Sequence, residues 1–183
     1  MNALAAYARE RLPLPVFAPA LAQLAGLAWV ASGAPAAALP WCVAVVSLLV
    51  VQFRLWDDLE DLDLDRLAHP SRVLTHASLR PFRVALAISI VVAGAAFAAS
   101  TSTLVAYAGL CLAMLAAYRA VRRRVTDRSW RYGLLLLKYP AFVVLVVTAF
   151  GEADVLRAFV AAAIAYAAAA GYEAWHTQNG VAS

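Results

Sequence analysis

The chain has 183 residues, of which 64% are hydrophobic and 14% charged, and its mean hydropathy is +0.76. This composition excludes an ordinary soluble domain and indicates an integral membrane protein. The net charge of +4 does not indicate a nucleic-acid partner, because the arginines lie in short connections between apolar segments. Membrane topology and lipid phosphate account for arginines in such places.

Apolar segments long enough to cross a bilayer follow one another along the chain. A membrane-spanning helix needs about 20 mostly apolar residues. The segments are continuous and rich in Ala and Leu, without the alternation typical of a membrane β-barrel. We therefore expect an all-α protein, a polytopic transmembrane helix bundle that forms a single domain over residues 1–183. The expected spans are six, at roughly 14–33, 39–55, 84–100, 103–119, 132–150 and 155–175.

The basic residues are distributed unevenly between alternate connections. They gather in the N-terminal arm, in the long connection after the second span and in the connection after the fourth, whereas the other connections hold few. Because basic loops stay on the cytoplasmic side, both termini and the aspartate-rich segment over 56–83 are predicted to be cytoplasmic. The expected location is the inner membrane of the cell, in contact with membrane lipids.

Six of the eleven acidic residues lie between positions 57 and 65, directly after the second span. Carboxylates this close repel one another unless they are solvated, paired with arginines or neutralised by a bound cation. The second helix is expected to continue past Trp56. Asp58, Asp61 and Asp65 would then share one helix face through their i, i+3, i+7 spacing. Three convergent carboxylates suit Mg²⁺, which prefers oxygen ligands and often bridges carboxylates to phosphate.

Arginines lie close to these aspartates in the sequence. Arg54 precedes the acidic segment, and Arg66 and Arg72 follow it. A guanidinium group can bind two phosphate oxygens at once. Carboxylates for a metal and arginines for phosphate are together what a metal-diphosphate site needs.

The acidic segment also resembles a known motif. The stretch DDLEDLDLDR over 57–66, followed by HPSRVL over 69–74, is similar to the first aspartate-rich motif of the UbiA superfamily of intramembrane prenyltransferases. The family pattern N/D-D-x-x-D-x-x-x-D, then a basic residue, a proline and an R-P-L-like tripeptide, fits without a gap. Asp57 stands where Asn is usual, and Val73 stands where Pro is common. The sequence around Tyr118 and Lys138 is similar in placement to the family's middle region.

The resemblance implies a helical bundle with a central cavity, in which Mg²⁺ holds a polyprenyl diphosphate. The prenyl group would then be transferred to a lipophilic acceptor. Developing charge on the leaving diphosphate would be stabilised by the metal and by arginines. The implied metal ligands are Asp58, Asp61 and Asp65, the implied phosphate contacts are Arg66 and Arg72, and Asp57 would be a neighbouring polar contact.

The C-terminal half departs from the family pattern, because it has no second aspartate motif of the DxxxD type. Its nearest substitute is YEAWH at 172–176. Glu173 and His176 would form either a reduced second metal site, with a catalytic role for Glu173, or part of an interfacial belt of aromatic residues. Three alternatives follow: a compact enzyme, a homo-oligomer or partner complex that completes the cavity, or a non-catalytic relative that binds isoprenoid lipid.

Lys138, the only lysine, lies inside the predicted span 132–150. Charged residues within membranes are rare and usually functional. We expect Lys138 near the floor of the cavity, where it would have a catalytic role and meet Asp61, Glu173 or the diphosphate. The alternative is that its long side chain snorkels to the membrane interface.

Two other membrane functions fit less well. A CDP-alcohol phosphotransferase would carry a glycine-containing D-G-x-x-A-R pattern, which is absent from the chain. A cation transporter would place its acids in the middle of the membrane rather than at the end of a helix.

Overall fold

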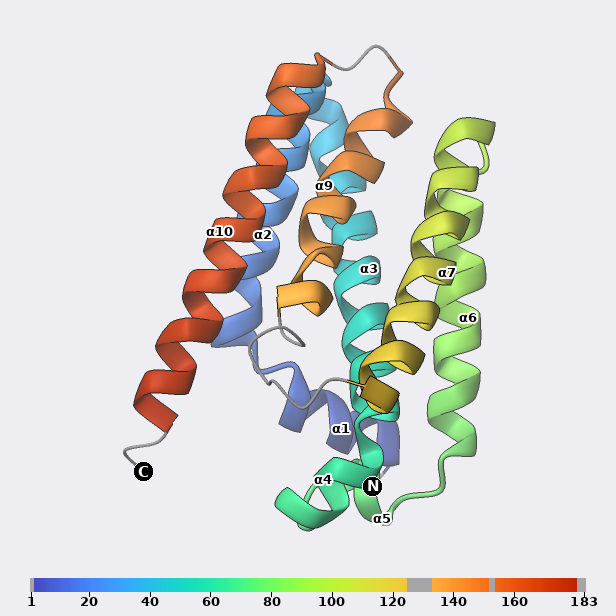
Figure 1. The fold of residues 1–183 in the computed structure, drawn as a ribbon. Coiled ribbons are helices and arrows are strands. Elements are labelled where there is room, and N and C mark those ends of the chain that lie inside the picture. The colour runs from blue at the N-terminus through green and yellow to red at the C-terminus, as the bar shows by residue number, and fades with distance from the viewer. Residues whose placement is uncertain (1, 125–132, 152–153, 181–183) are drawn as a thin grey trace.

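The chain folds into a bundle of long helices with short helices at one end (Figure 1). The computed structural model describes residues 2–124, 133–151 and 154–180, and over these residues it contains no β-strand. The all-α prediction is therefore confirmed for the described part of the chain. The helices are α1 (Ala3–Arg11), α2 (Leu14–Ser32), the 3-10 helix η1 (Ala36–Ala38), α3 (Leu39–Glu60), α4 (Leu62–Ala68), α5 (Val73–His76), α6 (Arg80–Phe97), α7 (Thr101–Arg124), α9 (Lys138–Ala149) and α10 (Val155–Gly180).

Among the described residues, five helices are long and apolar enough to cross a membrane, namely α2, α3 together with η1, α6, α7 and α10. They correspond to five of the six expected spans. The expected span 132–150 is also helical, but it forms only a shorter apolar helix over Gly133–Ala149. The expectation of six full-length spans is therefore corrected to five, with one shorter apolar helix packed among them.

The shorter helix is interrupted by a turn at Leu137. Pro140 has no backbone N–H, so it cannot bond to the carbonyl group of Leu136. In the turn just before it, the N–H of Leu137 bonds to the carbonyl oxygen of Leu134, three residues back, at 3.2 Å. Helix α9 starts again at Lys138, and proline is tolerated in such a first turn. The interruption places a lysine at the start of a helix inside the bundle.

Helix α3 lies at the centre of the bundle. It packs against α2, α6 and α9, and α9 in turn contacts α2, α7 and α10. The main core contains buried residues of all these helices, including Phe53, Phe97 and Phe142. Because α3 also carries the first aspartates, it connects the core directly to the candidate site.

A polar contact joins α3 to its neighbours within the apolar spans. The hydroxyl of Tyr107 donates to Oε1 of Gln52 at 2.9 Å and to the carbonyl oxygen of Ile90 at 3.2 Å. Gln52 is fully buried. Buried side-chain hydrogen bonds of this kind hold membrane helices together, so this contact fixes α3 relative to α6 and α7.

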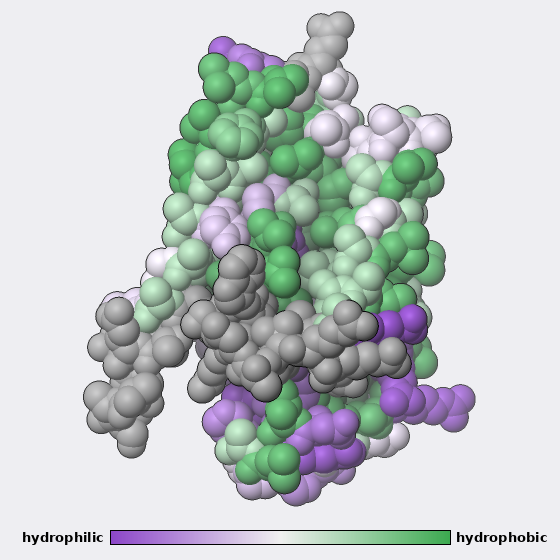
Figure 2. Space-filling model, in the orientation of Figure 1, coloured by the Kyte–Doolittle hydropathy of each residue, from purple (hydrophilic) through white to green (hydrophobic). Residues whose placement is uncertain are grey.

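The short helices α1, α4 and α5 gather at one end of the bundle, the end at which α10 also finishes (Figure 1). A second, smaller core joins them to the spans, and we call it the end core: Tyr7, Leu55, Leu62, Leu74 and Phe82. Figure 2 shows hydrophilic residues at this end and mostly hydrophobic surface above it. The aspartate segment and the N-terminal helix therefore lie together at one end of the protein.

Candidate functional site

The aspartate segment covers the end of α3 and the start of α4, so it is not one continuous helix. Helix α3 continues past Trp56 as expected, but it ends at Glu60, and α4 begins at Leu62. Asp61 lies between them with φ −90° and ψ 4°. The change in direction at Asp61 interrupts the regular 3.6-residue repeat on which the expected common face of the three aspartates depended.

Asp58 is held by the N-terminal helix. Nη2 of Arg11 donates to Oδ1 at 2.6 Å, and Nε of Arg11 donates to Oδ2 at 2.9 Å. The hydroxyl of Tyr7 also donates to Oδ2, at 2.8 Å. Only 6% of the Asp58 side chain is exposed. A carboxylate this buried needs a cation, and α1 supplies it.

The contact with Asp58 also changes the protonation behaviour of α1. Burial, together with the charge and hydrogen bond of Asp58, raises the pKa of Tyr7 well above its ordinary value. Burial by itself would lower the pKa of Arg11, but the hydrogen bond and the charge of Asp58 outweigh it and raise that pKa. Tyr7 therefore stays a protonated donor and Arg11 stays charged.

Asp65 forms an ion pair with Nη1 of Arg72. Beside this pair, the backbone N–H of Val73, at the start of α5, donates to a carboxylate oxygen of Glu10 at 2.9 Å. Asp58 and Asp65 line one narrow crevice between the short helices and the end of α3. Its lining residues are Tyr7, Glu10, Arg11, Asp58, Asp65, Arg72 and Leu74.

Asp57 faces other partners. Its carboxylate accepts hydrogen bonds from Nζ of Lys138 and from the hydroxyl of Tyr118. Lys138 is 5% exposed, so it does not snorkel to the interface. Asp57 is not among the partners that we expected for Lys138, and it is reached because α9 begins beside the end of α3 that carries it.

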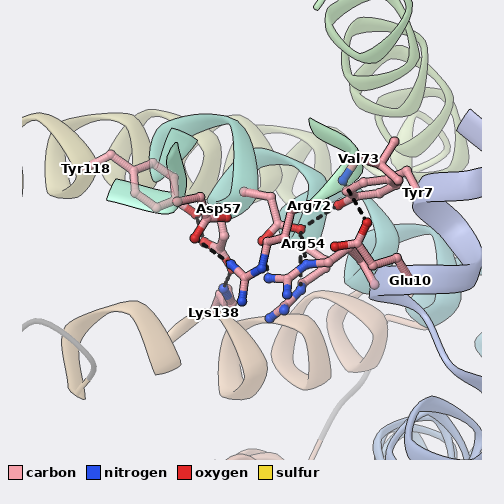
Figure 3. A network of polar contacts seen from close by, with 11 residues as sticks. Tyr7, Glu10, Arg54, Asp57, Arg72, Val73, Tyr118 and Lys138 are labelled. Atoms are coloured by element: carbon pink, nitrogen blue, oxygen red, sulfur yellow. Dashed lines mark hydrogen bonds and ion pairs between the residues drawn. The ribbon is translucent and has the colours of Figure 1, made fainter. Parts of the chain in front are cut away.

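The two halves of the network meet around Arg54 and Arg72 (Figure 3). Tyr118 and Lys138 lie on one side of this view, Tyr7 and Glu10 lie on the other, and the two arginines lie between them. Nε of Arg54 is 3.7 Å from Oδ2 of Asp58, which is too far for a direct hydrogen bond. This buried Nε has no hydrogen-bond partner among the described residues.

The remaining expected site residues are placed less centrally. Arg66 pairs with Asp63 at 3.2 Å on the surface, where 52% and 82% of the two side chains are exposed. Arg66 is not among the lining residues of the crevice. Asp61 lies at the junction of α3 and α4 and also does not line the crevice. Glu173 is in α10, but its side chain lies outside the described residues, as does that of His176.

Metal-binding capacity is limited in this arrangement. Over the part of the chain that the structure describes, no three His, Cys, Asp or Glu side chains gather in a way that would hold a metal ion. The carboxylates of Asp57, Asp58 and Asp65 are each bonded to a protein cation. Their oxygen atoms are suitable donors for Mg²⁺, but a metal ion would compete with these cations.

Several residues of the site were not expected from the sequence, namely Tyr7, Glu10 and Arg11. From the sequence, Arg11 is interpreted only as one of the basic residues that set the membrane topology. Tyr7 and Arg11 are spaced i, i+4, so an N-terminal helix would place them on one face. Asn2, whose side chain caps α1 by accepting from the N–H of Leu4 at 3.1 Å, was the available signal for that helix.

No family model, curated protein or solved structure matches the chain. The class of protein therefore follows from its own features. The chain is an all-helical integral membrane protein, whose aspartate-rich helix end is neutralised by cations from α1, α9 and the segment before α5.

Proposed function

We propose that this chain binds a polyprenyl diphosphate at the aspartate-rich end of its bundle and transfers the prenyl group to a lipophilic acceptor, as a UbiA-like, Mg²⁺-dependent intramembrane prenyltransferase. One observation carries the proposal. Asp57, Asp58 and Asp65 and their cationic partners from three other elements converge where apolar spans end. A diphosphate with a hydrophobic tail has the matching shape, with a charged head and an apolar body.

The basic residues would bind the diphosphate. The buried Nε of Arg54 has no hydrogen-bond partner among the described residues, so it is available to an anionic oxygen. Arg72 and Lys138 each neutralise a single aspartate and would exchange it for phosphate. Charge-assisted hydrogen bonds to phosphate are strong and specific, and the apolar spans behind the site would hold the prenyl chain.

The expected metal ligands are Asp58, Asp61 and Asp65, which offer the oxygen donors that Mg²⁺ prefers. When bound, Mg²⁺ would add positive charge beside the diphosphate as it leaves. Around it, Arg54 and Lys138 would hold the phosphate oxygens in place. Preorganised positive groups of this kind stabilise charge that develops during reaction.

A second candidate is an isoprenoid-binding membrane protein without turnover, or one that requires a partner subunit. It is favoured by the contacts of Asp58, because both of its oxygens already accept hydrogen bonds from Arg11 and Tyr7. A carboxylate satisfied in this way stabilises the structure without a metal ion. In this case the cationic residues would hold the head group, and no diphosphate would be released.

The test measures binding and diphosphate release with labelled geranylgeranyl diphosphate, Mg²⁺ and a candidate lipophilic acceptor. The purified wild type is compared with Asp61→Asn and with the matched control Asp63→Asn, whose side chain is 82% exposed. We expect Mg²⁺-dependent binding and release in the wild type and in the control. Both should fall by at least about tenfold in Asp61→Asn, the loss of one charge-assisted contact.

The two candidates give different results. Binding without release supports the isoprenoid-binding protein, and the assay would then be repeated with a different acceptor or with a partner subunit. Full activity of Asp61→Asn, or equal loss in Asp63→Asn, would contradict a specific role of the aspartate motif. Absence of binding in every sample would reject both candidates.

A further inference from the structure

Helix α6 has an apolar face that no other helix covers. The helix lies at the edge of the bundle, where it packs mainly against α3 and α7 (Figure 1). Its buried residues, which include Phe82 and Phe97, face these neighbours. Val84, Ile88 and Val91 are exposed and are spaced i, i+4, i+7, so they form one stripe, which we call the outer stripe. In an integral membrane protein, such a stripe contacts the acyl chains of lipids.

Two arginines continue the outer stripe into the first turn of α6. Arg80 and Arg83 are both exposed. Arg80 precedes Arg83 by three residues and Val84 by four, so the arginines lie on the same side of the helix as the stripe. The 18 residues of α6 extend over about 27 Å, close to the thickness of the hydrocarbon core of a bilayer. The first turn therefore lies at the level of the lipid head groups.

These two arginines differ from several other basic residues at this end of the bundle. Within the described part of the chain, neither side chain forms a hydrogen bond or an ion pair. By contrast, an aspartate neutralises each of four neighbouring cations, namely Arg11, Arg66, Arg72 and Lys138. Two positive charges without a described partner, next to an apolar stripe, are complementary to a negatively charged head group that carries acyl chains.

We propose that Arg80, Arg83 and the outer stripe of α6 form a binding site for an anionic phospholipid. A guanidinium group can bind two oxygen atoms of a phosphate group, and the acyl chain would lie along the outer stripe. A zwitterionic lipid fits less well, because its own positive group reduces the attraction to the arginines. Neither arginine lines the crevice beside the aspartates, so the inference is independent of the proposed function.

The lipid would also stabilise this end of the protein. Phe82, which lies between the two arginines in sequence, is fully buried in the end core. Its ring packs against that of Tyr7, with ring centroids 5.5 Å apart, and the hydroxyl of Tyr7 donates to Asp58. A ligand that binds only the folded protein raises its stability. We therefore expect an anionic lipid on the first turn of α6 to raise the thermal unfolding midpoint.

The test titrates the full chain, purified in a non-ionic detergent, with phosphatidylglycerol and separately with phosphatidylcholine. Native mass spectrometry measures the bound lipid. The variants are Arg80→Gln, Arg83→Gln and the combination of both. Arg157→Gln is the matched control, because Arg157 lies in the first turn of another span but is paired with Asp154 at 3.3 Å. The thermal unfolding midpoint is recorded for each protein with and without phosphatidylglycerol.

We expect the wild type to bind phosphatidylglycerol more tightly than phosphatidylcholine. Each single variant should bind phosphatidylglycerol about fivefold more weakly, and the double variant about 25-fold more weakly, given the attraction of one basic residue to anionic lipid. Arg157→Gln should keep the wild-type affinity. Phosphatidylglycerol should raise the unfolding midpoint of the wild type and the control, but not that of the double variant. If the double variant does not fold, as judged by its circular dichroism, the single variants decide the question.

Three results would overturn the inference. Equal binding of the two lipids by the wild type, or unchanged phosphatidylglycerol binding in the arginine variants, would show that the arginines do not hold a head group. An equal loss in Arg157→Gln would show that only the net charge of the protein matters. A dimer that forms without lipid and is lost in the double variant would assign the outer stripe to a second copy of the chain.

Discussion

Asp57 and Asp58 are neighbours in sequence, yet they serve different parts of the molecule. Successive residues of an α-helix point about 100° apart, so Asp57 faces α7 and α9 while Asp58 faces α1. The carboxylate of Asp57 binds Lys138 and Tyr118, and that of Asp58 binds Arg11 and Tyr7. Two adjacent residues thus connect the end of α3 to both sides of the site.

The buried pair of Lys138 and Asp57 gives a prediction for stability. Lys138→Met leaves Asp57 without its cation, and breaking a buried ion pair on one side destabilises a protein by about 3–5 kcal/mol. The double variant Asp57→Asn with Lys138→Met should be less destabilised than Lys138→Met alone, because no unpaired charge remains. The free energy of unfolding in a mixed-micelle titration measures both.

An exposed ion pair of the same protein serves as the control. Arg157 and Asp154 are 3.3 Å apart, with 66% and 50% of their side chains exposed. Arg157→Gln should change the free energy of unfolding by less than about 1 kcal/mol, since surface pairs contribute little. Equal losses in Lys138→Met and in the double variant would show that the charge of Asp57 is not the cause.

At the scale of elements, the ends of helices decide how the site is built. Helix α3 ends at the aspartates, α9 begins at Lys138, and α5 begins where Val73 donates to Glu10. At the opposite end of the bundle, turns connect successive long helices. Gly33 ends α2 in the left-handed conformation, with φ +64°, a common helix termination that favours glycine.

Gly33→Ala should lower the free energy of unfolding by about 1 kcal/mol, since other residues are strained in this conformation. Gly26→Ala is the matched control within the same helix. An added Cβ at Gly26 would meet no other atom within 4 Å, and alanine in a helix interior is favoured over glycine by about 0.5–1 kcal/mol. The two variants should therefore shift the thermal unfolding midpoint in opposite directions, and a shift in the same direction would contradict this assignment.

The long helices could be predicted from the sequence and the contacts between them could not. Hydropathy located all six apolar segments, because length and composition alone decide which segments suit a membrane. The turn at Asp61 was missed, as was the helix α1, which is short and polar. Local sequence patterns do not show such interruptions when packing between distant segments determines them.

The candidate site could be predicted only in part, because some of its contacts also depend on packing between distant segments. The segment 57–74 is recognisable in the sequence as a cluster of acids and arginines, since these residues are close together along the chain. The pairs of Lys138 with Asp57 and of Arg11 with Asp58 join residues 81 and 47 positions apart. A single sequence carries no signal for such long-range pairs, so only the structure identified the partners.

For the whole molecule, the gathering of α1, α4 and α5 at one end gives a test of orientation. The basic connections predict that this end is cytoplasmic. In a background with Cys42→Ala and Cys111→Ala, we would introduce Asp63→Cys near the aspartates and Ala99→Cys between α6 and α7. Both positions are exposed. A membrane-impermeant maleimide added to intact cells should label position 99 and not position 63.

Labelling after cell lysis provides the control, because both cysteines should then react. Labelling of position 63 in intact cells would reverse the predicted orientation. Labelling of both positions in intact cells would contradict a bundle whose two ends lie on opposite sides of the membrane.

The position of α1 also affects how this protein should be handled at the bench. Residues 7, 10 and 11 contact Asp58 and α5, although they are close to the first residue of the chain. An affinity tag or fluorescent fusion placed directly before this helix would crowd the aspartate segment, and trimming the first eleven residues would remove the cation bound to Asp58.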